Sequence, residues 1–223
     1  MSKLQHGSTD QRRIIGLTGG IGMGKTTVSD YLANAHHLPV LDADVYAREA
    51  VEPGSPILKK IVERYGSSIL LPNQTLDRVR LGSIVFKSRP ERFWLERQIH
   101  PFVRDRIQAD LKAAKLRSEA IVVVSIPLLF EARMTDLVNE IWVVYCPHGH
   151  QVKRLMKRDT QEGDRSHRLT VEEIQSRIDS QMAIGKKLAQ ADVVLDNSST
   201  VEALLNQVDR ALGQSQIREL TPS

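Results

Sequence analysis

The chain has 223 residues, of which 41% are hydrophobic and 26% are charged, a composition that is typical of a folded globular protein and excludes a disordered chain. This length favours one compound domain over two independent ones. The formal net charge of +4 suits an anionic partner, but aromatic residues make up only 4% and no run of five Lys or Arg occurs. We therefore expect a small phosphorylated substrate and no nucleic-acid partner.

The cellular context is predicted from what the sequence lacks. Cys146 is the only cysteine, which excludes an internal disulfide and a cysteine-cluster zinc site and fits a reducing cytosol. Residues 1–11 are polar, and no stretch of about 18 apolar residues occurs. We expect a cytoplasmic protein without a membrane segment, either a monomer or a weak homo-oligomer.

Five short apolar runs alternate with helical patterns along the chain, which predicts an α/β fold with a mainly parallel sheet. The run of β-branched residues at 121–124 is typical of a central strand that is covered on both faces. The predicted strands are residues 14–18, 38–41, 120–125, 140–145 and 192–195.

The longer stretches between these strands predict two additions to the core. Residues 45–116 read as helices, broken by Pro and Gly at 52–56 and 71–73, and predict a helical insertion beside a cleft. The charged segment 154–187 predicts a lid. The core then comprises 12–44, 117–153 and 188–212 of one compound domain, 12–212, and residues 1–11 and 213–223 are predicted to be flexible tails. Capping boxes predict helix starts at Ser88, Thr170 and Ser199.

A phosphate-binding loop follows the first predicted strand. Residues 19–26 read Gly-Gly-Ile-Gly-Met-Gly-Lys-Thr and match the pattern Gly-x-x-x-x-Gly-Lys-[Ser/Thr] between a strand and a helix. The glycines let backbone N–H groups surround phosphate oxygens, Lys25 reaches the β- and γ-phosphates, and the Thr26 hydroxyl binds Mg²⁺. We expect ATP to be held by Gly20, Ile21, Gly22, Met23, Gly24, Lys25, Thr26 and Thr27.

Two carboxylates, Asp42 and Asp44, lie at the carboxyl end of the second predicted strand, where ligands bind in parallel α/β sheets. Phosphoryl transfer to a hydroxyl needs an acidic group near Mg²⁺ and another that orients or deprotonates the hydroxyl. We assign Asp44 as the base and Asp42 as the partner of the metal. Either residue also fits the N-cap of the following helix.

Basic residues of the predicted lid are candidates to neutralise charge on the transferred phosphoryl group, although each also fits a solvated surface charge. They are Arg154, Arg158 and Arg177, with Arg165, His167 and Arg168 as further candidates. His100 precedes Pro101, which is expected to bend or break its helix, so the ring either faces the cleft or is structural. Residues 121–125 end without Asp or Glu, which argues against a motor or switch ATPase.

The ordered set of motifs resembles the dephospho-coenzyme A kinase family over roughly residues 13–212. The resemblance is carried by the phosphate loop, Asp42-Ala43-Asp44, Ile99-His100-Pro101, Pro127-Leu128-Leu129-Phe130-Glu131, Arg158-Asp159, Arg177-Ile178 with Gln181-Met182, and Asp196-Asn197-Ser198. It implies a P-loop NTPase core of three layers, α/β/α, with a five-stranded sheet. It also implies transfer of the ATP γ-phosphoryl group to the 3′-hydroxyl of the ribose of dephospho-coenzyme A.

The resemblance further implies roles for single residues. Arg48, His100, Leu128 and Glu131 would border the acceptor, with Arg177 nearby, and Asn197 would border the adenine of ATP. Arg158 would act on the transferred group. One departure is the insertion at 160–169, which lengthens the predicted lid and leaves the roles of its arginines open. The residues by themselves also fit a kinase for a nucleoside or a shikimate-like acid, or a non-catalytic nucleotide-binding module.

Overall fold

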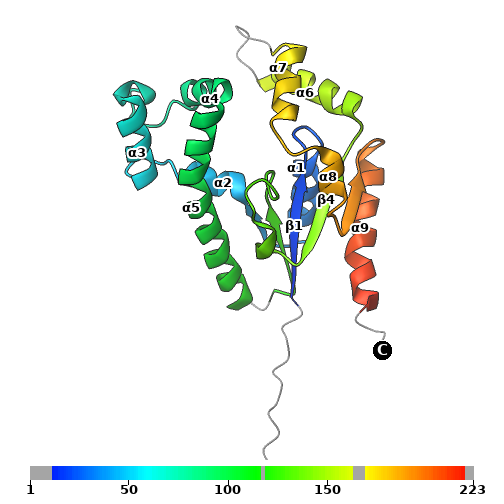
Figure 1. Ribbon diagram of the computed structural model, residues 1–223. Coiled ribbons are helices and arrows are strands. Elements are labelled where there is room, and N and C mark those ends of the chain that lie inside the picture. Colours follow the sequence, from blue (N-terminus) through cyan, green and yellow to red (C-terminus); the bar gives the residue numbers. More distant parts are fainter. Residues whose placement is uncertain (1–11, 117–118, 163–168, 219–223) are drawn as a thin grey trace, which may run out of the picture.

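Five parallel strands form the centre of the fold in a computed structural model that describes residues 12–116, 119–162 and 169–218 (Figure 1). The strands follow the order β2-β3-β1-β4-β5, and every neighbouring pair is parallel. Their bounds are β1 (Arg13–Gly19), β2 (Val40–Asp42), β3 (Ile121–Ser125), β4 (Glu140–Tyr145) and β5 (Val193–Asp196). The prediction of a five-stranded, mainly parallel sheet is confirmed.

Helices cover both faces of this sheet, as its apolar strands require. On one face, α1 (Lys25–Asn34) and α9 (Val201–Arg218) pack Leu32, Leu204 and Val208 against the strands. On the other face, α2 (Ala43–Glu49), α5 (Arg89–Leu116) and α8 (Ile184–Leu188) contribute side chains such as Tyr46 and Ile107 to a second core. These are the three layers of the predicted core.

Helices occupy the segment predicted as an insertion, residues 45–116, and they have a small core of their own. It contains α2, α3 (Pro56–Tyr65), the 3₁₀ turn η1 (Ser67–Ile69), α4 (Arg78–Lys87) and α5. Ile61 and Ile69 are fully buried there, with Trp94 of α5 packed against them. The helix α5 is 28 residues long and contains Pro101 without a break, because packing at both of its ends outweighs one lost hydrogen bond.

Two further helices, α6 (His148–Glu162) and α7 (Val171–Asp179), occupy the segment predicted as a lid. Figure 1 shows them beyond the carboxyl ends of the strands, opposite α3 and α4. The capping box at Thr170 is confirmed. At Ser88 only the first half forms, since Glu91 N–H meets the Ser88 hydroxyl at 3.4 Å while the Glu91 carboxylate binds Arg64.

The last helix corrects two sequence-based predictions. Its capping side chain is Thr200, which accepts the Ala203 N–H at 3.2 Å, rather than Ser199. The helix also continues past Leu212 to Arg218, within the segment predicted as a tail. Gly213 does not end it, because one glycine costs a helix only about 1 kcal/mol relative to alanine.

In the parts of the chain that the structure describes, no helix has the length and apolar character needed to cross a membrane.

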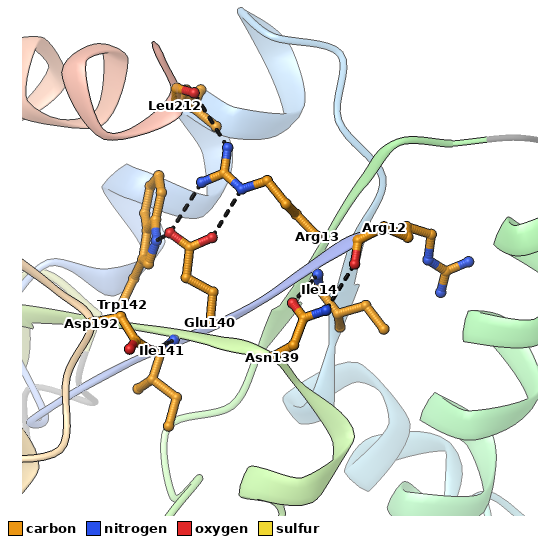
Figure 2. A network of polar contacts seen from close by, with 9 residues as sticks. All are labelled: Arg12, Arg13, Ile14, Asn139, Glu140, Ile141, Trp142, Asp192 and Leu212. Atoms are coloured by element: carbon orange, nitrogen blue, oxygen red, sulfur yellow. Dashed lines mark hydrogen bonds and ion pairs between the residues drawn. The ribbon is translucent and has the colours of Figure 1, made fainter. Parts of the chain in front are cut away.

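The amino-terminal edge of the sheet is held by polar contacts (Figure 2). Arg13 binds both oxygens of Glu140 at 2.9 and 3.0 Å and donates to the Leu212 carbonyl at 3.2 Å. The Trp142 indole donates to Glu140 at 2.8 Å. These contacts join β1, β4 and α9 at the edge opposite the carboxyl ends of the strands.

Candidate active site

A cleft of about 610 Å³ opens at the carboxyl edge of the sheet. Its walls come from the loop between β1 and α1, the first turn of α2, the middle of α5, the loop after β3, and α6. Of the predicted site residues, it brings together Gly20, Ile21, Gly22, Gly24, Lys25, Thr26, Asp44, His100, Leu128 and Arg158. Residues from distant parts of the chain thus share one cavity.

The phosphate loop has the backbone that its sequence predicts. Gly22 and Gly24 have positive φ angles of 74° and 101°, and α1 begins at Lys25, directly after the loop. A β-carbon on Gly24 would collide with the side-chain amide of Asn197. Glycine is therefore required at residue 24 for both its conformation and its space. The start of α1 adds the partial positive charge that stabilises bound phosphate.

Lys25 extends across the cleft to the sheet, where its ammonium group donates to the hydroxyl of Ser125. Ser125 is fully buried at the end of β3, the position at which the sequence lacks the acidic residue of many NTPases. The hydroxyl holds the lysine without neutralising its charge. Ser125 is a site residue that sequence reasoning missed, because its only signal was the absence of a carboxylate.

Asn197 and Arg154 hold the backbone of the phosphate loop at Met23. The buried Asn197 amide donates to the Met23 carbonyl at 2.9 Å, and Arg154 donates to the Asn197 carbonyl at 3.0 Å and to its side-chain oxygen at 3.2 Å. Arg154 lines the cleft, whereas Asn197 and Met23 do not. A contact of Asn197 with adenine stays a prediction, and its side chain is engaged in holding the loop.

Two glutamines hold the residue at the tip of the loop. Gln151 donates to the Ile21 carbonyl at 2.8 Å, and the Gln181 side-chain oxygen accepts the Ile21 N–H at 2.9 Å. The first comes from α6 and the second from the segment between α7 and α8. The helix that leads into the predicted lid and the segment that follows α7 are thereby both attached to the phosphate loop.

The two carboxylates predicted at the end of β2 have different surroundings. Asp42 is the N-cap of α2, since its Oδ1 accepts the Asp44 N–H at 2.8 Å, which confirms the capping interpretation for this residue. Asp44 faces the cleft. Asp44 is exposed, but its partial desolvation in the cleft raises its pKa and the charge of Asp42 raises it further, against the opposing effects of Lys25, Arg48 and Arg158. A carboxylate with a raised pKa is a stronger base while it stays ionised near neutral pH.

The site fits a Mg²⁺ ion that arrives with ATP. In the described ranges, no group of three or more His, Cys, Asp or Glu is placed to hold a metal by itself. Mg²⁺ bound to a nucleotide needs only one or two protein oxygens, because phosphates and water supply the rest. Thr26 lines the cleft, and Asp42 has a second carboxylate oxygen outside its capping bond. Asp42 is not among the residues that line the cleft, so its part in holding Mg²⁺ stays a prediction.

The acceptor side of the cleft is built by α5 and the loop after β3. His100 and Leu128 line it, so of the two alternatives for His100 the ring is on the cleft side, and its contact with the acceptor stays a prediction. Burial lowers the pKa of His100, and the charge of Glu96 opposes that shift only in part. The ring is therefore neutral near pH 7 and offers one donor and one acceptor.

Arg48 is exposed on α2, outside the cleft lining, and acts on the site through its charge on Asp44.

Two predicted acceptor residues make contacts elsewhere. Glu131 pairs with the fully buried Lys187 at 2.9 Å and is not among the residues that line the cleft. Arg177 places its guanidinium 5.9 Å from the ring centre of Phe86, which connects α7 to α4. Thr27 also lies outside the cleft lining. The further candidates Arg165, His167 and Arg168 lie outside the described residues.

Comparison with known proteins gives one consistent result. The family model described as dephospho-CoA kinase matches residues 13–203. Dephospho-CoA kinase of Trichormus variabilis is 56% identical over 201 residues, covering 90% of this chain and 97% of that protein.

Solved structures agree with the family match. TT1252 from Thermus thermophilus is 30% identical, with a TM-score of 0.70 over 95% of this chain and 99% of that one. Dephospho-CoA kinase from Campylobacter jejuni is 27% identical, with a TM-score of 0.65 over 90% and 96% of the two chains. The matched span contains the phosphate loop, Asp44 and the whole cleft. This protein belongs to the dephospho-CoA kinase family.

Proposed function

We propose that this cleft carries the γ-phosphoryl group of ATP to the 3′-hydroxyl of the ribose of dephospho-coenzyme A, with Asp44 as the base. Family membership makes the protein a kinase that forms coenzyme A and ADP. The observation that carries the residue assignment is that Asp44 lines the same cleft as Lys25, Thr26 and Arg158. A base and a phosphate cradle in one cavity are what transfer to a hydroxyl requires.

The nucleotide half of the site binds and orients ATP. The N–H groups of the phosphate loop and the start of α1 hold the phosphates, and Lys25 supplies a positive charge that Ser125 keeps in place. Mg²⁺, held by Thr26 and Asp42, would neutralise charge on the phosphate oxygens. Arg158 adds a further cation on the cleft wall and is proposed to act on the transferred group.

The acceptor half positions the hydroxyl. Asp44 accepts its proton as the oxygen attacks the γ-phosphorus, and the bond from that phosphorus to the bridging oxygen of ADP breaks. His100 and Leu128 line the same cleft and are proposed to border the acceptor. Arg48, Glu131, Arg177 and Asn197 are proposed to act around this core, with Glu131 and Asn197 working through the backbone segments that they hold. A cytoplasmic location fits a step of coenzyme A biosynthesis and is proposed with it.

The test is ADP formation with Mg-ATP and a panel of acceptors that contains dephospho-coenzyme A, a nucleoside and shikimate. We expect turnover with dephospho-coenzyme A and a product one phosphoryl group heavier by mass spectrometry. Turnover confined to another acceptor would refute the proposed substrate. ATP binding without turnover on any acceptor would identify a non-catalytic nucleotide-binding module.

A further inference from the structure

Gln181 lies at the junction of α7 and α8 with its side chain in the wall of the cleft. Its Oε1 accepts the Ile21 N–H at 2.9 Å, which determines the orientation of the amide, because only the oxygen accepts a hydrogen bond. The Nε2 group is then the end directed away from the loop. In the ranges that the structure describes, this Nε2 donates no hydrogen bond to the protein. A polar donor thus remains available in the cleft.

The backbone beside Gln181 is held by a buried ion pair. The Met182 N–H donates to Glu131 Oε1 at 2.8 Å, and Lys187 binds the same oxygen at 2.9 Å. Lys187 is fully buried and also donates to the Pro127 carbonyl at 3.2 Å. Glu131 Oε2 is buried and has no hydrogen-bond partner among the described residues. Burying such a pair is costly for stability, and its local effect is to hold the segment of Gln181 against the loop that follows β3.

We propose that Gln181 has two functions in the transfer step: its oxygen holds Ile21, and its amide nitrogen donates to the phosphoryl group while that group moves between ATP and the acceptor. The proposal rests on the proposed function. Lys25, Asp44 and Gln181 line one cavity, and the Gln181 side chain is attached to the phosphate loop at Ile21, so its amide shares the cleft with both the phosphate cradle and the base. A donor already fixed in place stabilises charge that spreads over the transferred oxygens. Since it is neutral, it adds no charge that would lower the pKa of Asp44.

Two variants separate the two functions. Gln181→Glu keeps an oxygen for the Ile21 N–H but loses the donor and adds a negative charge, whereas Gln181→Met loses the oxygen and the donor without adding a charge. An effect that both variants share therefore reports the loss of the donor. We expect Gln181→Glu to lower kcat at saturating ATP by about 10- to 100-fold, within or just below the range for losing one fixed donor, with little change in the melting temperature. The matched control is Gln175→Met on α7, because the Gln175 amide binds Asp179 outside the cleft and its loss should leave kcat unchanged.

A second measurement reports contact with the phosphoryl group itself. The ratio of kcat with ATP to kcat with ATPγS is measured for wild type, both Gln181 variants and the control. Sulfur accepts hydrogen bonds weakly, so the ratio should fall several-fold in both Gln181 variants and stay at the wild-type value in Gln175→Met. A wild-type ratio in Gln181→Glu, or a kcat within twofold of wild type, would overturn the proposal and leave Gln181 only its contact with Ile21. Failure of the proposed substrate would be seen separately, as wild-type protein that transfers to another acceptor, on which the same ratios are then compared.

Discussion

Four charged groups act on the carboxylate of Asp44 in addition to its partial burial in the cleft. Lys25, Arg48 and Arg158 lower its pKa, whereas Asp42 raises it. Burial outweighs the cations, so the pKa is raised from its ordinary value. The same cations keep the carboxylate ionised near neutral pH, the state in which it accepts a proton. The environment of one residue thus determines the base strength available to the reaction.

We expect Asp44→Asn to lower the rate of phosphoryl transfer by about 10²- to 10⁴-fold, the range for losing a positioned base. ATP affinity should change little, because Asn keeps the size of the side chain and the phosphate loop is untouched. Single-turnover kinetics and equilibrium binding of a non-hydrolysable ATP analogue measure the two quantities. A transfer rate close to that of wild type would show that Asp44 is not the base and is only a residue of the first turn of α2.

The raised pKa of Asp44 predicts where activity is lost in acid. As the pH falls through that pKa, Asp44 becomes protonated and the base disappears, so the acid limb of kcat should lie above the ordinary Asp value of about 3.9. Arg48→Met removes a cation that lowers this pKa and should move the limb to higher pH. The measurement is kcat against pH for both proteins. A limb that moves to lower pH in Arg48→Met would contradict the electrostatic assignment.

At the scale of elements, a cation–aromatic contact connects α7 with α4 outside the cleft lining. Arg177 of α7 lies over the Phe86 ring of α4, and Phe86 is exposed. That Arg177 binds the acceptor stays a prediction, and its observed contact connects the lid helix to the helical insertion. A cation placed near an exposed aromatic ring contributes about 0.5–1 kcal/mol. This energy is suited to a contact that forms and breaks during turnover.

We expect Phe86→Ala to raise the KM for dephospho-coenzyme A about two- to fivefold, which corresponds to the loss of that contact energy. ATP affinity should be unchanged. Phe93→Ala is the matched control, because Arg97 lies over Phe93 at the same 5.9 Å but both residues belong to α5. Steady-state kinetics measure the KM for dephospho-coenzyme A in both variants. Equal effects of Phe86→Ala and Phe93→Ala would show that the contact between α7 and α4 has no role in acceptor binding.

The whole molecule depends on contacts at the edge opposite the cleft, shown in Figure 2. The Arg13 and Glu140 side chains are only 14% and 17% exposed, and they join β1 and β4 while Arg13 also reaches α9. Removing one member of such a pair leaves the other charge nearly buried and without compensation. These contacts stabilise the sheet far from the chemistry, so their loss should affect folding and not catalysis.

We expect Glu140→Ala to lower the free energy of unfolding by about 3 kcal/mol, the scale for breaking a buried pair, while kcat at a permissive temperature stays at the wild-type value. Asp136→Ala is the control: Asp136 binds Arg104 at 2.8 Å with comparable geometry, but its side chain is 63% exposed. Its loss should cost less than about 1 kcal/mol. Urea denaturation of both variants tests this difference, and similar costs would show that burial does not set the strength of these pairs.

The sequence by itself determined the features whose signal is local. The five strands, the helical insertion and the phosphate loop follow from apolar runs, breakers and glycine spacing within short windows. The N-cap role of Asp42 was also within reach, because capping involves residues two positions apart. Errors at this level were small, such as the shift of one residue between Ser199 and Thr200.

Only the tertiary structure decided which side chains support the cleft. Gln181 and Ile21 are 160 positions apart, Lys187 and Glu131 come from different elements, and Asn197 reaches Met23 across 174 positions. No window of sequence contains both members of these pairs, since they meet only when the helices pack on the sheet. The same packing directs Arg177 toward Phe86 and Glu131 toward Lys187. The phosphate loop and the two carboxylates can therefore be recognised from short stretches of sequence. The contacts that hold them in the cleft exist only in the folded chain.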